Sequence, residues 1–137
     1  MRAARAAITR LTAPLAALAA AGAATAWVAL TDPNEPGGYP ACPVPALTGV
    51  FCPGCGGLRS VHALTRGDAA AALSANTLVV AGCAVLAVVW AGWLVQAVRG
   101  RPLALPDPRP VHFWLLGGLV MLFTVLRNLP GGAALAP

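Results

Sequence analysis

Four cysteines are the residues of this chain best suited to chemistry, and three of them lie close together in the sequence. Cys52 and Cys55 enclose a Pro-Gly dipeptide, and this C-x-x-C spacing brings two sulfurs close enough to form a disulfide or to supply half of a tetrahedral metal site. Cys42 precedes Cys52 by ten residues. Cys83 lies within a long apolar run, where a single thiol acts as a small packing residue.

Three chemical interpretations of these cysteines stay open at this point. A dithiol pair would carry out redox chemistry, because the C-x-x-C spacing lowers the pKa of the leading thiol. A zinc site would use the ligand set Cys42, Cys52, Cys55 and His62, although the spacing is not that of a standard zinc finger. Alternatively, Cys42 pairs with Cys52 or Cys55 and staples a proline-rich loop in an oxidising compartment.

No other pattern in the sequence indicates catalysis. We find no nucleophile with an adjacent base, no phosphate-binding glycine-rich loop and no paired carboxylates within the apolar runs. We therefore predict no catalytic residues and no cofactor other than zinc. A late Arg127-Asn128 pair is the remaining polar feature, and we expect it to meet Asp68, Asn76 or the C-x-x-C turn, because a buried arginine near a membrane surface needs a partner.

The composition places these residues in a membrane protein. Of the 137 residues, 58% are hydrophobic and 9% are charged, and nine arginines without any lysine contribute to a net charge of +5. A soluble domain of this size carries far more charge, and nucleic-acid binding needs a clustered basic surface. We therefore predict contact with the lipid bilayer and none with nucleic acid.

Three apolar stretches have about the length that a helix needs to cross a bilayer. The predicted spans cover residues about 11–31, 77–98 and 111–129 of a single integral membrane domain, 1–137. The third reaches spanning length if the Arg127 side chain extends to the lipid headgroups. The predicted fold class is thus an all-α membrane protein with three transmembrane helices and a long outward loop that contains a short amphipathic helix.

The arginines also predict an orientation. They cluster before the first span and between the second and third spans, and short cytoplasmic loops carry such an excess. The N-terminus is therefore expected in the cytoplasm, with loop 32–76 and the C-terminus outside the cell membrane. The first span also resembles a secretory signal with an Ala24-Thr25-Ala26 cleavage site. We favour its retention, because its uncharged run exceeds the roughly 7–15 residues of a usual signal.

The outward loop 32–76 divides into two halves. Six prolines and several glycines predict an irregular, turn-rich first half. In the second half, residues 58–66 are predicted to form an amphipathic helix that ends at Gly67. Asp68 is then the expected N-cap of a helix that leads directly into the second span.

A series of motif residues runs through this loop and ends near the C-terminus: Cys52, Pro53, Cys55, Gly56, Arg59, Gly67, Asp68, Asn76, Arg127 and Asn128. In this order they resemble a family of short bacterial membrane proteins, the domain-of-unknown-function family 2752. Where that family commonly has Thr-Arg-Ala and Asn-Pro, this chain has Leu58-Arg59-Ser60 and Asn76-Thr77. The resemblance implies a membrane location and a shared motif, and it implies no particular activity.

Together these features predict a small polytopic membrane protein with an accessory or scaffolding role, organised around an outward-facing C-P-G-C loop. The alternative is a membrane thiol-disulfide redox or zinc-binding protein that uses Cys52 and Cys55. Besides lipid, the expected partner is a second copy of the chain or another membrane protein.

Overall fold

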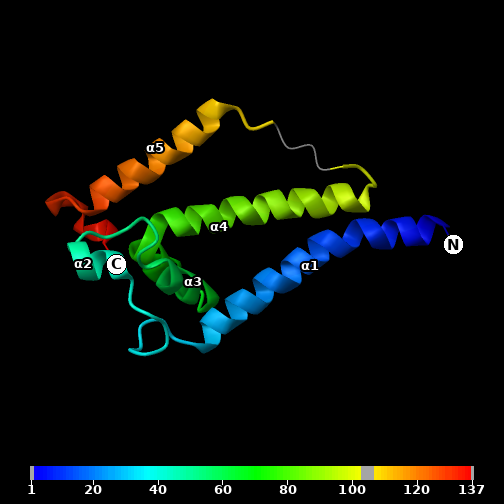
Figure 1. Cartoon of the computed structure of the whole chain (residues 1–137). Helices are drawn as coiled ribbons and strands as arrows, with labels where there is room; N and C mark the ends of the chain where they lie inside the picture. The colour runs from blue at the N-terminus through cyan, green and yellow to red at the C-terminus, as the bar shows by residue number, and fades with distance from the viewer. Residues whose placement is uncertain (1, 103–106, 137) are drawn as a thin grey trace.

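The computed structural model describes residues 2–102 and 107–136, and within these ranges the regular structure is entirely helical. Figure 1 shows the elements in chain order. They are α1 (Arg2–Leu30), α2 (Pro43–Thr48), α3 (Gly57–Thr65), α4 (Ala69–Val98), α5 (Pro110–Arg127) and the short 3₁₀ helix η1 (Pro130–Leu135).

Three of these helices are long and apolar enough to cross a membrane: Thr9–Leu30 within α1, α4 and α5. Hardly any of their side chains are buried against the rest of the chain. Apolar side chains that face outward along a whole helix are stable in lipid, which is as apolar as they are. The predicted all-α fold class is therefore confirmed, with three helices that are long and apolar enough to span a membrane.

Helices α1 and α4 run side by side, and α3 packs against both of them at one end (Figure 1). The Trp90 indole of α4 donates a hydrogen bond to the Pro14 carbonyl of α1, with an N···O distance of 2.9 Å. At the other end of α1, the His62 ring of α3 donates to the Val28 carbonyl at 2.9 Å. Helix α5 diverges from α4 in Figure 1 and is joined to it through η1, near its own C-terminal end.

A tight corner joins α3 to α4, as the Gly67-Asp68 pair predicts. Gly67 has a φ of +76°, which places it in the left-handed region that favours glycine. The Asp68 amide donates to the Ala63 carbonyl at 3.0 Å and so completes the end of α3. The Asp68 carboxylate then accepts a hydrogen bond from the Ala71 amide at 2.9 Å, which makes Asp68 the N-cap of α4.

Helix α4 contains a kink at Asn76, close to the predicted start of the second span at residue 77. The backbone of Asn76 is extended, with φ −165° and ψ 95°. Its side-chain oxygen accepts a hydrogen bond from the Val79 amide at 3.1 Å and thereby caps the second part of the helix. The kink is thus present although this chain has Thr77 at the position where the family that it resembles commonly has proline.

The expectation of a wholly irregular first half of loop 32–76 is wrong at α2. The proline that begins this helix is compatible with it, because the first amide of a helix has no intrahelical acceptor and its loss costs nothing. Cys42 immediately precedes α2 in an extended conformation. The short helix therefore sets the direction in which the chain leaves Cys42.

The buried interior is small, partly polar and concentrated where loop 32–76 meets the ends of the long helices. Arg127, Asn76 and Ser60 are among the largest fully buried side chains, with exposed fractions of 2%, 0% and 0%. In a chain surrounded by lipid, polar side chains are the ones that gain most from burial against other polar groups. The polar interior marks this end of the molecule as the place where a site is built.

Candidate thiol site

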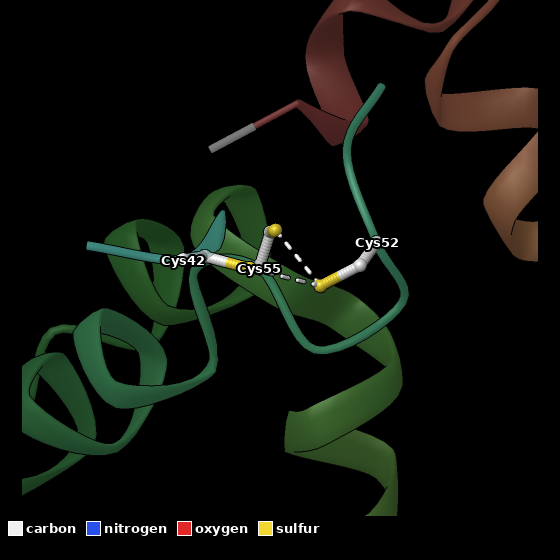
Figure 2. A group of neighbouring side chains, drawn as sticks. All are labelled: Cys42, Cys52 and Cys55. Carbon is white, nitrogen blue, oxygen red and sulfur yellow. Dashed lines mark hydrogen bonds between the residues drawn. The ribbon is translucent and has the colours of Figure 1, made fainter. Parts of the chain in front are cut away.

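Three sulfurs meet at the loop end of the molecule (Figure 2). The Sγ atoms of Cys42, Cys52 and Cys55 all lie within 4.8 Å of one another. The Cys52 sulfur is 2.9 Å from that of Cys55 and 3.8 Å from that of Cys42. Cys52 is therefore the common neighbour of the other two cysteines.

The C-x-x-C turn is held first by its own backbone. The Cys55 amide donates to the Cys52 carbonyl at 3.1 Å, and the Gly57 amide donates to the Gly54 carbonyl at 2.9 Å. Gly56 has a φ of +79°, and this left-handed residue turns the chain into α3 directly after Cys55. The motif glycine is thus required by the backbone conformation.

Arg127, the last residue of α5, clamps the same turn from outside the loop. Its Nη1 donates to the Cys52 carbonyl at 2.9 Å and its Nη2 to the Cys55 carbonyl at 3.1 Å. The guanidinium carbon lies 5.0 Å from the centre of the Phe123 ring and 5.9 Å from that of Phe51, within the range of cation–π attraction. The expected contact between Arg127 and the C-x-x-C turn is present, and the side chain is buried there instead of extending toward headgroups.

Two asparagines complete the clamp. The Asn76 amide group donates to the carbonyls of Pro53 at 2.8 Å and Cys55 at 3.0 Å. Asn128 pairs with the backbone of Phe51, accepting from its amide at 2.8 Å and donating to its carbonyl at 2.9 Å. Helices α4 and α5 and the residue that follows α5 therefore hold the backbone from residue 51 to 55, and this leaves the sulfurs free for chemistry.

The two motif thiols differ in burial and in acidity. Hydrogen bonding from the Cys55 thiol lowers the pKa of Cys52, helped by backbone N–H groups of the turn and by Cys42. Burial raises the pKa of Cys55 to about 11, and its hydrogen bond to Cys52 adds to the increase. Cys55 is 7% exposed whereas Cys52 is only partly buried. The pair thus combines a partly exposed thiol that ionises more readily with a neighbouring buried thiol that ionises less readily.

An open groove of about 920 Å³ lies beside the sulfurs. Its walls come from residues 33–37, 39–42, 45, 51–52 and 54–59, so they include all three clustered cysteines. Arg59, a motif residue, lines this groove with an exposed side chain. A groove of this size admits a peptide segment or a small molecule to the sulfurs.

Residues 42–90 match the family model described as Protein of unknown function (DUF2752). This confirms the resemblance, and the matched segment holds the C-P-G-C-G motif, Arg59, the Gly67-Asp68 corner and Asn76. Arg127 and Asn128 lie outside the matched segment, yet the fold places both against the motif turn. Searches of curated proteins and of solved structures found no match to this chain.

His62 is the predicted metal ligand that the structure does not bring to the sulfurs. Its Nδ1 is bonded to the Val28 carbonyl, and its Nε2 lies 3.8 Å from the Asp32 carboxylate. The ring therefore ties α3 to the end of α1, which explains its burial. Cys83, expected to be a packing residue, is in α4 and is not a member of the sulfur cluster.

Three residues that support the site were not predicted from the sequence. Ser60 is fully buried, and its hydroxyl donates to the Ala72 carbonyl at 2.8 Å, joining α3 to α4. Phe51 and Phe123 flank the Arg127 guanidinium from two different segments. The position of Phe51, directly before the motif, is the one signal in the sequence that pointed to any of them.

Proposed function

We propose that this chain is an accessory membrane protein that carries a thiol-disulfide exchange centre on the outer face of the cell membrane. In this centre Cys52 is the attacking thiolate and Cys55 is the resolving thiol. The observation that carries the proposal is the asymmetric pair itself. Cys52 and Cys55 both line an open groove, Cys52 is partly exposed whereas Cys55 is buried, and their sulfurs are 2.9 Å apart. A dithiol needs this arrangement in order to bond to a substrate sulfur first and then release it.

The lowered pKa of Cys52 supports the assignment of roles, because the thiolate is the nucleophile in disulfide exchange. Arg127 supports the formation of a thiolate at this site, without distinguishing the two cysteines. Among the described residues no carboxylate forms an ion pair with this buried arginine, and its hydrogen bonds go to the carbonyls on either side of the two thiols. A buried cation at this position favours a thiolate nearby.

The exchange consists of two balanced steps. The Cys52 thiolate attacks one sulfur of a substrate disulfide, so that a mixed disulfide forms, the substrate S–S bond breaks, and one substrate thiolate leaves and takes a proton from water. Cys55 then loses its proton to water and attacks the Cys52 sulfur, which expels the second substrate thiolate, and this thiolate also takes a proton from water. The protein pair is oxidised to a disulfide by two electrons, and the substrate disulfide is reduced to two thiols. A dithiol from outside the chain returns the pair to the reduced state by the same steps in reverse.

A chemical test uses the protein purified in detergent, with Cys42 and Cys83 replaced by serine so that the pair is alone. An aromatic disulfide such as Ellman's reagent should release two chromophores per chain and leave a Cys52-Cys55 disulfide. In the Cys55→Ser variant it should release one and stay bound to Cys52, because no resolving thiol remains. Equal behaviour of the two proteins, or exchange that persists in Cys52→Ser, would rule out these roles.

The outward orientation is a separate part of the proposal, and the arginine distribution supports it. Arg10 lies near Gly100 at the end of the helix pair opposite the sulfurs, and Arg99 and Arg101 lie at the same end. Such an excess of arginine in short segments is typical of the cytoplasmic side. The three sulfurs would then face outward.

Sidedness is tested on intact cells with a maleimide that cannot cross membranes. A chain whose only cysteine is Cys52 should be labelled without lysis. A matched chain whose only cysteine comes from Arg101→Cys should be labelled only after lysis. The reverse pattern would place the thiol site in the cytoplasm.

A further inference from the structure

Cys42 is the thiol that the proposed exchange does not use. Its sulfur is 3.8 Å from that of Cys52, and it lies in an extended conformation directly before α2. We propose that the reduced site binds one copper(I) ion through the three thiolates of Cys42, Cys52 and Cys55. This binding does not depend on the exchange chemistry, because exchange needs only the C-x-x-C pair.

The distances between the sulfurs fit a single metal ion. With metal–sulfur bonds of roughly 2.3 Å, three sulfurs arranged around one ion lie roughly 4 Å apart. The sulfurs here are separated by 2.9 Å and 3.8 Å, with every pair within 4.8 Å. Side-chain rotations that move each sulfur by less than about 1 Å would therefore place the three sulfurs in a regular triangle.

The number and the softness of the ligands favour copper(I). The cluster has three members in the part of the chain that the structure describes, and all three ligand atoms are sulfur. Thiolate sulfur binds both zinc and copper(I), but structural zinc sites use four protein ligands, so a set of three thiolates favours copper(I). His62, the fourth ligand in the zinc prediction, is held by the Val28 carbonyl and Asp32.

The surroundings suit a negatively charged metal-thiolate centre. Binding breaks three S–H bonds, forms three Cu–S bonds and releases three protons to solvent, with no electron transferred. The product carries a net negative charge, and the Arg127 guanidinium is hydrogen-bonded to the carbonyls of Cys52 and Cys55. This cation lowers the cost of the charge in a partly buried site. The groove that the sulfurs line gives the ion a path from solvent.

The test is an anaerobic titration of the full-length reduced protein in detergent with copper(I), in competition with a chromogenic copper(I) chelator. One ion should bind per chain, and X-ray absorption should count three sulfur neighbours. Cys42→Ser should lower the affinity by at least about 100-fold, since loss of a group that only supports a ligand already costs 10–100-fold. Cys83→Ser and His62→Gln are the matched controls, and both should bind copper(I) as the native chain does.

The outcomes separate this proposal from the exchange chemistry. A Cys42→Ser chain that still exchanges disulfides through Cys52 and Cys55 but has lost copper(I) affinity supports three-thiolate binding in a folded protein. Native affinity in Cys42→Ser, or only two sulfur neighbours in the native protein, would overturn it. So would a loss of copper(I) affinity in His62→Gln, because it would show that the site uses the histidine as a fourth ligand. Should Cys42→Ser fail to fold, the sulfur count on the native protein decides alone.

Discussion

Replacing Arg127 with alanine is expected to release the C-x-x-C turn from α5. The guanidinium makes two hydrogen bonds to the turn and lies 5.0 Å from the Phe123 ring. Hydrogen bonds from a charged donor contribute about 1.5–3 kcal/mol each. The lower value applies here, because the Cys52 carbonyl keeps the Cys55 amide as a donor and the Cys55 carbonyl keeps Asn76.

With about 1 kcal/mol added for the cation–π contact, the free energy for opening the turn should fall by about 4 kcal/mol. This corresponds to a rise of about 10³-fold in the population of the open turn. Cys55 reports this opening, because its thiol is 7% exposed in the closed turn and reacts once the turn opens. The clamp acts on backbone carbonyls, so it remains intact when the other three cysteines are replaced by serine.

The assay is the alkylation rate of Cys55 in that single-cysteine chain, measured by mass spectrometry in detergent. Arg127→Ala should raise the alkylation rate of Cys55 by about three orders of magnitude. The rate in Arg127→Lys should lie between those of the native residue and Arg127→Ala, since lysine keeps the charge but loses the forked geometry. Arg99→Ala, which removes an exposed arginine after α4, is the control and should leave the rate unchanged. A change of less than about threefold in folded Arg127→Ala would refute the clamp.

Three further predictions concern the same end of the molecule. Asn76→Ala removes two hydrogen bonds to the turn and the cap on the Val79 amide, so thermal unfolding should show that the free energy of unfolding falls by about 3 kcal/mol. Asn76→Asp keeps only the cap and should also be destabilised. Native-like stability of Asn76→Asp would contradict the role of the two donated hydrogen bonds. The Cys55 thiol lowers the pKa of Cys52, so Cys52 alkylation should reach half its maximal rate at a higher pH in Cys55→Ala, whereas Cys55→Ser retains a donor and should shift less; identical pH profiles would exclude this hydrogen bond. Ser60→Ala should cost about 1 kcal/mol in the same unfolding assay, because its hydroxyl donates to the Ala72 carbonyl, and full native stability would show that the bond contributes nothing.

Much of the local structure was predictable because its causes are local. Uncharged runs of about 20 residues predict membrane-spanning helices without reference to any neighbour. Gly67 followed by Asp68 predicts the end of one helix and the cap of the next for the same reason. The short helix α2 was missed, because a high proline content was taken as excluding helix, although proline is tolerated in the first turn.

The candidate site was only partly predictable. The C-x-x-C spacing alone pointed to a pair of close sulfurs, and the structure places the Cys42 sulfur beside them. His62 was expected in the same set on the basis of residue type, but its ring is used to join α3 to α1. Residue type identifies which groups can bind a metal, whereas the direction of a side chain depends on which helices pack together.

The sequence by itself determined the number of long apolar helices, the corner between α3 and α4, and the presence of a dithiol turn, since each arises from residues near one another in the chain. Only the tertiary structure decided that Arg127 and Asn128, more than 70 residues from the motif, hold its backbone. Hydropathy cannot encode that contact, because an arginine at the end of a span is equally compatible with headgroups. The buried position is favoured because the carbonyls of the turn give the guanidinium hydrogen-bond acceptors there, which a buried charged group requires.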